Sequence, residues 1–157
     1  MTGMDVLRRC RSYKKDIERL NLRRMCAQDV ATRSTRSMDV SGHVGGMTDA
    51  MGNYVARVDE IDRMISIRKE MYAIEREAAA VLIAGFSEPM QGIAMYHGWL
   101  CGLTTRQTAA VMKNSESAVR GLRRRGREIL EGLDAELDTN PEYLELSRMY
   151  DLIENAH

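Results

Sequence analysis

The sequence predicts an all-α protein, built from a long N-terminal helical hairpin, a helix-turn-helix and a final acidic helix. Among its 157 residues only two are prolines and 5% are aromatic, whereas Met, Arg, Ala, Glu and Leu are abundant. Straight-chain side chains favour helices, and β-branched and aromatic side chains favour strands. Apolar side chains also recur every three or four residues, the period of an amphipathic helix. A chain of this length fits one domain, or one small domain with a helical extension.

Two long stretches with this period predict a helical hairpin over residues 1–85. The first runs from Met4 to about Ala27, and its apolar stripe consists of Val6, Cys10, Tyr13, Ile17 and Leu20. The second runs from Asp49 to about Ala84, and its stripe consists of Tyr54, Val58, Ile61, Ile65, Tyr72 and Ala79. Such narrow stripes must be buried against a partner helix. They can pair within one chain or between chains, so we expect this region to mediate homo-oligomerisation.

Residues 29–49 separate the two stretches and predict a long loop. They are rich in Ser, Thr, Gly and Asp and lack an apolar period. Three glycines lie near His43, yet the segment has neither the lysine and serine ending of a phosphate-binding loop nor a preceding strand. We therefore interpret it as a flexible connector.

A second unit is expected over residues 86–134, and it begins with a third helix over about 88–100. Gly85 can stop the preceding helix, Ser87 can cap the new one, and Pro89 fits its first turn. This helix leads directly into the segment with the most informative pattern.

Residues 104–130 predict two short helices separated by a break. Thr104 or Thr105 is the expected cap of the first helix, and Ser115 is the expected cap of the second. In the break, Asn114 is expected to take a left-handed conformation. This layout is typical of a helix-turn-helix. The residues expected to face inward are Leu103, Ala109, Met112, Val119, Leu122 and Ile129.

Charge is distributed unevenly along a chain whose formal net charge is zero. The net charges of residues 1–36, 37–84, 85–127 and 128–157 are +6, −3, +5 and −8. Two basic stretches and an acidic tail in one neutral chain indicate a charged partner for at least one of them.

The helix after Ser115 carries five arginines between Arg120 and Arg127. In a helix-turn-helix bound to double-stranded DNA, the outward side at the start of the second helix faces base edges in the major groove, and flanking basic residues contact phosphates. Arg120 is the expected base contact. The full set of expected DNA-binding residues is Thr105, Arg106, Ser115, Glu116, Ser117, Arg120, Gly121, Arg123, Arg124, Arg125 and Arg127.

An acidic unit over residues 135–157 follows, with a helix expected from Pro141 to Glu154. Its apolar side chains must pack nearby. The tail can fold back on the arginine-rich helix and compete with DNA, or it can extend toward a partner such as RNA polymerase. Of these two arrangements we favour the first.

Several classes of function lack support in the residues. No window reaches the roughly 18 apolar residues of a membrane span, and the start lacks the apolar run of a signal peptide, so we expect a cytoplasmic protein. Cys10, Cys26 and Cys101 form no close pair and the histidines are remote from them, so neither a metal nor a cofactor is expected. No nucleophile or paired-carboxylate motif is present, so we expect no enzymatic activity.

The segment from Gly98 to Leu130 resembles the sigma-70 region 4-like helix-turn-helix of phage and prophage late-gene transcriptional activators, the RinA and ArpU-like group. The residues that carry this resemblance are Trp99, Gly102, Leu103, Thr104, Ser115, Val119 and Leu122. Family members tend to have an aliphatic residue at the position of Thr108, Gly at that of Lys113, and a basic or polar residue at that of Glu116. The resemblance implies a sequence-specific DNA-binding regulator whose recognition helix covers about 115–130.

Two other functions remain open from the sequence. A phage small terminase subunit also joins a helix-turn-helix to a helical hairpin, and uses the hairpin to build a ring for genome packaging. A helical interaction scaffold would use the hairpin and bind no DNA. The number of subunits separates the regulator from the terminase, and salt-dependent DNA binding separates both from the scaffold.

Overall fold

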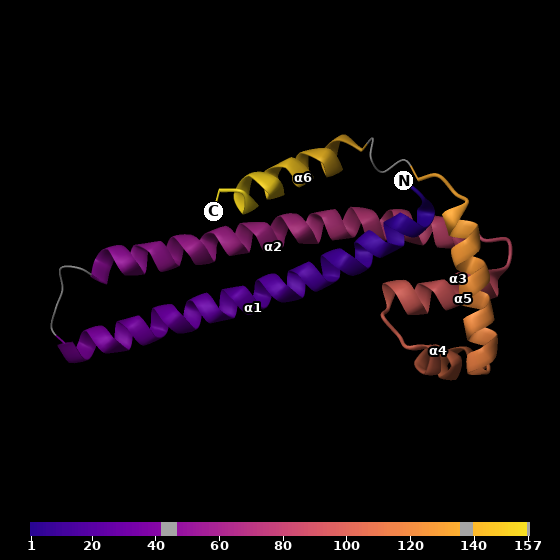
Figure 1. Ribbon diagram of the computed structural model, residues 1–157, viewed down its shortest axis with the longest axis horizontal. Helices are drawn as coiled ribbons and strands as arrows, with labels where there is room; N and C mark the ends of the chain where they lie inside the picture. Colours follow the sequence, from indigo (N-terminus) through magenta and orange to yellow (C-terminus); the bar gives the residue numbers. More distant parts are fainter. Residues whose placement is uncertain (42–46, 136–139, 157) are drawn as a thin grey trace.

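The computed structural model describes residues 1–41, 47–135 and 140–156, and this part of the chain is helical and contains no strand. Its elements are α1 (Gly3–Ser41), α2 (Met47–Ala84), α3 (Pro89–Met95), the π-helical turn η1 (Tyr96–Leu100), α4 (Thr105–Met112), α5 (Glu116–Glu131) and α6 (Pro141–Glu154). Figure 1 shows α1 and α2 as a long antiparallel pair, α6 along α2, and α3, α4 and α5 gathered at one end. The predicted all-α class is confirmed.

One apolar seam joins α1 to α2. Its buried side chains include Leu7, Cys10, Leu20, Ala27, Ile61, Met64, Ile65, Met71 and Ala79. In this structure of one chain, the two stripes pack against each other. Arg24 and Asp62 form an ion pair across the seam, with 2.5 Å between Nε and Oδ1, and this interaction raises the pKa of Arg24.

The expected loop over residues 29–49 is wrong at both of its ends. Helix α1 continues to Ser41 and α2 begins at Met47, while residues 42–46, His43 among them, lie outside the described residues. Ser and Thr are tolerated in a helix when the hydroxyl bonds to the preceding turn. Thr32 does this, because its Oγ1 donates to the carbonyl of Gln28 at 2.9 Å. Residues 29–41 and 47–49 are therefore helical despite a composition typical of loops.

The expected helix from Pro141 to Glu154 is confirmed as α6. Asn140 caps it, because its Oδ1 accepts from the backbone N–H groups of Glu142 and Tyr143. A cap of this kind satisfies N–H groups that have no partner inside the helix.

Helix α6 packs on the hairpin, so the expectation that it folds back on the arginine-rich helix is wrong. The guanidinium carbon of Arg68 on α2 lies 3.6 Å from the ring centroid of Tyr150 and 4.7 Å from that of Tyr13 on α1. Tyr143 and Leu146 are also buried here. The apolar side of α6 covers the seam between two other helices, and nothing in its own sequence specified that seam as its partner.

The expected third helix is present as α3 followed by η1. Its N-cap residue is Glu88, without a side-chain cap, and not the expected Ser87. Gly92 allows α3 to approach α2, since a Cβ at this position would lie 2.9 Å from the carbonyl oxygen of Ile83. The π-helical turn ends at Leu100, and the chain then turns toward α4.

The end of α5 is fastened to the start of α1. The backbone N–H of Gly3 donates to the carbonyl of Leu133 at 2.8 Å, and that of Ala135 donates to the carbonyl of Met1 at 2.8 Å. The side chains of Met4 and Leu130 are fully buried at this junction. The hairpin therefore supports α5 at its C-terminal end and leaves the N-terminal end near α4.

Candidate nucleic-acid interface

Thr104 fixes the start of α4. Its Oγ1 accepts from the backbone N–H of Gln107 at 3.2 Å, and Oε1 of Gln107 accepts from the backbone N–H of Thr104 at 2.9 Å. This reciprocal pair is a capping box. Of the two caps that the sequence offered, Thr104 is therefore the one in the structure, and Thr105 is the first helical residue.

A left-handed residue makes the turn between α4 and α5. That residue is Lys113, with φ of 54° and ψ of 44°, and the expectation that Asn114 would fill this role is wrong. The N–H of Asn114 donates to the carbonyl of Ala109 at 3.0 Å, which satisfies the last turn of α4. Asn favours the left-handed conformation more than Lys does. The hydrogen bonds at the end of α4 nevertheless place that conformation one residue earlier, at Lys113.

Ser115 caps α5 as predicted, because its Oγ accepts from the backbone N–H of Ala118 at 3.1 Å. The inward side of α5 consists of Val119, Leu122, Gly126 and Leu130. Ile129 was expected to face inward and is 38% exposed, whereas its neighbour Leu130 is fully buried. The final turn of α5 packs on the start of α1, and that direction favours Leu130.

Arg123 points into the protein and not toward the solvent. Its guanidinium donates to the carbonyls of Ala94 and Leu103 and to the hydroxyls of Thr105 and Thr108. Burial lowers the pKa of Arg123, and the charge of the nearby Arg11 lowers it further. Of the five arginines, this one ties α5 to α3, to α4 and to the segment between them.

The sequence did not indicate two residues that accommodate Arg123, namely Thr108 and Gly98. Thr108 is fully buried and supplies a hydroxyl acceptor. At Gly98 a Cβ would lie 2.7 Å from the guanidinium carbon, so only glycine leaves this space open. A polar residue at an inward helical position, where the family tends to have an aliphatic one, was the available signal for Thr108.

The exposed side of α5 carries a stripe that we call the basic face, formed by Ser117, Arg120, Arg124 and Arg127. These positions are three, four and three residues apart, so they follow one side of the helix, and all four are exposed. Oε2 of Glu116 lies 3.9 Å from a guanidinium nitrogen of Arg120. In the described part of the chain, Arg124 and Arg127 have no carboxylate oxygen within 4 Å.

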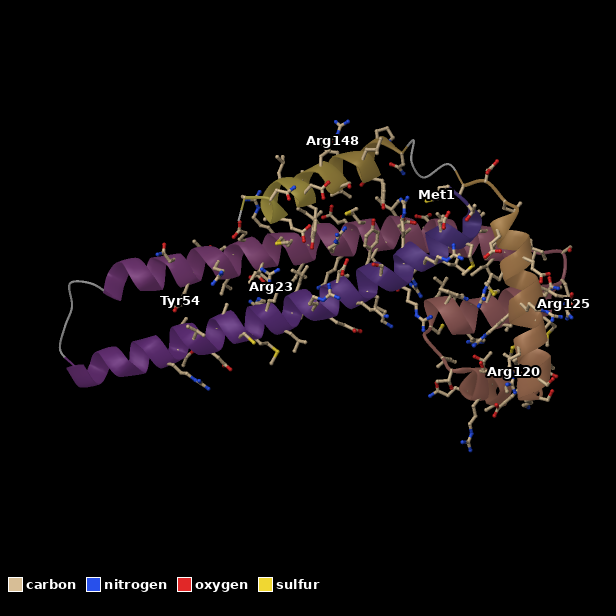
Figure 2. All side chains as sticks on the ribbon, in the orientation of Figure 1. Met1, Arg23, Tyr54, Arg120, Arg125 and Arg148 are labelled. Atoms are coloured by element: carbon tan, nitrogen blue, oxygen red, sulfur yellow. The ribbon has the colours of Figure 1, made fainter. Side chains whose placement is uncertain are left out.

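The other predicted site residues surround the basic face. Arg125 is exposed on α5 about 100° around the helix from Arg124, and Figure 2 shows it farther along α5 than Arg120. Gly121 is half-buried, and Arg106 is exposed on α4. The structure thus brings the predicted DNA-binding residues to one end of the molecule. Arg123 and Thr105 differ from the others, because the guanidinium of Arg123 donates to the hydroxyl of Thr105 within the protein.

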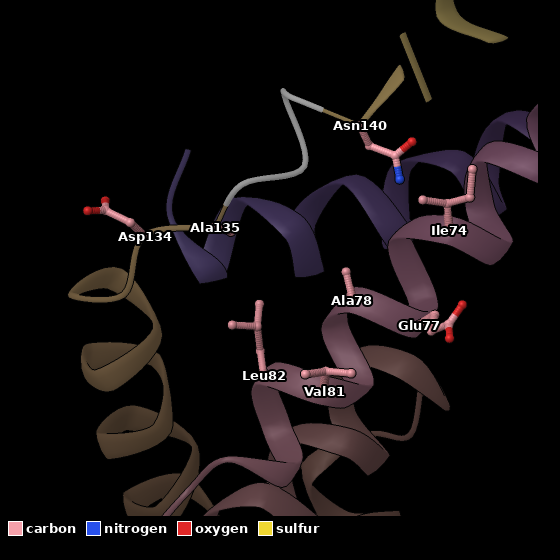
Figure 3. Close-up of a pocket in the computed structure, with 8 residues that line it drawn as sticks. All are labelled: Ile74, Glu77, Ala78, Val81, Leu82, Asp134, Ala135 and Asn140. Carbon is pink, nitrogen blue, oxygen red and sulfur yellow. The ribbon is translucent and has the colours of Figure 1, made fainter. Parts of the chain in front are cut away.

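An apolar cavity of about 430 Å³ lies on a different part of the molecule, against α2. Figure 3 shows Ile74, Ala78 and Leu82 on α2 along one wall, with Asp134, Ala135 and Asn140 near the other. Its lining is mostly aliphatic. No cluster of three or more metal-ligating side chains occurs among the described residues. No helix in the ranges 1–41, 47–135 and 140–156 is both long and apolar enough to span a membrane.

No family model, no curated protein and no solved structure matches this chain. The resemblance to the late-gene activators therefore remains a prediction that rests on the residues named above.

Proposed function

We propose that this chain binds double-stranded DNA, with α4 and α5 as a helix-turn-helix and α5 as the recognition helix. The observation that carries the proposal is the basic face, which lies on a capped helix and is free of carboxylate partners at Arg124 and Arg127. The major groove of B-DNA is about 12 Å wide and admits an α-helix. A helix supported only at its inner side and C-terminal end can enter it.

Arg120 is the proposed base contact, because it lies one turn from the N-terminal end of α5. A guanidinium can donate two hydrogen bonds to O6 and N7 of guanine. Glu116 is its neighbour on the same side of the helix. A carboxylate there repels phosphate but can accept from the amino group of cytosine, so the pair would favour a G·C base pair.

Phosphate contacts are the proposed role of Arg124, Arg127 and Arg125 on α5 and of Arg106 on α4. All four are exposed, and contacts of this kind raise affinity without adding sequence preference. Arg123 is left out of this set because its donors are already used inside the protein. The resemblance to late-gene activators supports a role in transcription, with RNA polymerase as the second partner.

Salt dependence of DNA affinity tests the proposal. Replacing Arg124 and Arg127 together by Gln should weaken binding to all duplexes alike, and should flatten the plot of log affinity against log salt by about 0.9 for each phosphate that is no longer neutralised. The measurement is fluorescence anisotropy of a labelled random-sequence duplex over a salt series. Arg148→Gln on α6, also exposed, is the matched control and should leave the slope unchanged. An unchanged slope in the double variant would contradict the assignment.

A further inference from the structure

Helix α6 packs along part of α2 and does not extend over the distal hairpin, which we define as residues 19–33 of α1 and 52–61 of α2. Figure 1 shows that α1 and α2 extend past the end of α6 and away from α3, α4 and α5. Large apolar side chains are exposed here, with Leu22 at 63%, Met25 at 61% and Val55 at 56%. Two helices can bury one seam between them, and the remaining apolar surface stays in contact with water unless another helix covers it.

Two of the grooves along the distal hairpin have charged linings of opposite sign, and a further groove on α2 shares Arg57 and Asp59 with them. The basic groove has a volume of about 470 Å³, and its charged lining residues are Arg19, Arg23 and Arg57. The acidic groove has a volume of about 490 Å³, and its charged lining residues are Asp29 and Asp59. Exposed apolar side chains belong to each groove: Leu22 and Val30 to the basic one, and Val55 to the acidic one.

The two grooves lie on different sides of the hairpin and partly overlap along its length. Tyr54, labelled in Figure 2, lines both of them. On α1 the basic groove uses Arg23 and Ala27 and the acidic groove uses Gln28 and Thr32. At 100° per residue these two pairs of positions project on different sides of the helix.

The charges that line the grooves are largely unused within the chain. Among the described residues, Arg23, Arg57, Asp29 and Asp59 form no ion pair, whereas Arg19 pairs with Asp16 at 3.4 Å. Opposite charges that meet across an interface fix its register and disfavour other partners.

We propose that a second copy of this chain docks on the distal hairpin, with the acidic groove of one copy against the basic groove of the other. Because the grooves overlap along the hairpin, copies that lie side by side in the same direction bring the basic groove with Arg23 and Arg57 next to the acidic groove of the next copy. An acidic peptide or a nucleic acid would cover the basic groove alone and leave the acidic groove and Val55 in water. A second copy covers both.

The interface is heterologous, because it joins two different surfaces of the chain. Each added copy presents a free groove again, so the assembly grows until it closes into a ring or extends as a filament. The proposed interface does not depend on DNA binding, so the chain can assemble in this way whether or not it binds DNA.

Charge reversal on the full-length chain tests this interface. One variant carries Arg23→Glu and Arg57→Glu, and the other carries Asp29→Lys and Asp59→Lys; all four positions are exposed, so the hairpin can accept these changes. We expect the unmodified chain to have a multiple of the 17.8 kDa chain mass in light scattering, and each variant alone to have the mass of one chain. An equimolar mixture should assemble again, because the reversed acidic groove of one variant then meets the reversed basic groove of the other.

A charge-reversed pair of residues outside the grooves is the control. Glu145→Lys with Arg148→Glu, on the exposed side of α6, should leave the assembly intact. Circular dichroism checks that each variant keeps its helices. If one does not, its milder substitute is Arg23→Gln with Arg57→Gln for the basic groove, or Asp29→Asn with Asp59→Asn for the acidic groove. The proposal is overturned if the unmodified chain is a monomer, if either variant stays assembled, or if the mixture stays monomeric. It is also overturned if Arg23→Glu and Arg57→Glu lower DNA affinity at unchanged mass, which would make the basic groove a nucleic-acid contact.

Discussion

At the scale of single residues, five arginines in one short run have different environments. Arg124, Arg125 and Arg127 are exposed, Arg120 is exposed beside Glu116, and Arg123 is held inside by four acceptors. One residue in such a run always falls near the inward side, because a helix turns through 100° per residue. Here the inward residue is Arg123. Thr108 accepts one of its hydrogen bonds, Gly98 leaves space for its guanidinium, and the side chain links α5 to α3 and α4.

Arg123→Gln should destabilise the protein, while Arg124→Gln should not. Removing the half-buried guanidinium leaves the carbonyl of Leu103 and the hydroxyl of Thr108 without this donor, at a cost of about 1–3 kcal/mol in the free energy of unfolding. The exposed change should stay within about 0.5 kcal/mol. Urea denaturation of both variants measures the difference. Equal stability of the two would show that the inward hydrogen bonds contribute little.

Two glycines on α5 should respond in opposite ways to alanine. At Gly126 a Cβ would lie 2.7 Å from Cγ of Met95, so Gly126→Ala should lower the unfolding free energy by about 1–3 kcal/mol through overpacking. At Gly121 the nearest atom is 3.8 Å away, so Gly121→Ala should raise it by about 0.5–1 kcal/mol through helix propensity. Thermal unfolding followed by circular dichroism distinguishes the two. A decrease at Gly121 would place another group against this face.

At the scale of elements, the turn between α4 and α5 sets how the basic face is presented. Only three residues, 113–115, connect the two helices, and each has a defined role: a left-handed residue, a donor to Ala109 and an N-cap. A connection this short fixes the direction of α5 relative to α4 more firmly than a long loop would.

Lys113→Gly should stabilise the protein. A left-handed conformation costs a residue with a Cβ about 1–2 kcal/mol, and glycine avoids this at an entropic cost of about 0.5–1 kcal/mol. The expected net gain in unfolding free energy is about 0.5–1 kcal/mol, measured by chemical denaturation. Asn114→Gly is the control, since Asn114 lacks a positive φ, and it should be neutral or destabilising. A gain at both positions would mean that the turn is strained elsewhere.

At the scale of the whole molecule, α6 acts as a third helix over one half of the hairpin. The guanidinium of Arg68 lies between the rings of Tyr150 on α6 and Tyr13 on α1, and the hydroxyl of Tyr143 accepts from Arg9 at 3.3 Å. Burial raises the pKa of Tyr143, so this phenol stays neutral over the ordinary pH range. Helix α6 thus packs on the hairpin and not on the basic face.

Tyr150→Ala should cost the protein about 3–5 kcal/mol of unfolding free energy, because it removes a buried ring and its interaction with Arg68. Leu152→Ala on the same helix is the matched control, since Leu152 is 74% exposed and should matter by at most about 0.5 kcal/mol. Differential scanning calorimetry of the full chain measures both. A similar melting temperature for the two variants would show that α6 is only loosely docked.

The sequence by itself determined the features that depend on neighbouring residues. The helical class follows from composition and from a period of three to four residues. The cap at Ser115, a cap at Thr104 or Thr105, and the start of α6 follow from side chains that bond to backbone groups within three positions. These interactions are local, so the order of residues contains the information that specifies them.

Tertiary structure decided the rest. The partner of α6, the inward direction of Arg123 and the choice of Leu130 over Ile129 all depend on where distant helices lie. The extension of α1 to Ser41 likewise overrode a composition typical of loops. Burial is a property of the assembled molecule, since the same amphipathic stripe can be covered by any apolar surface of matching shape. The packed helices of this chain select one such surface for each stripe and leave the basic face in water.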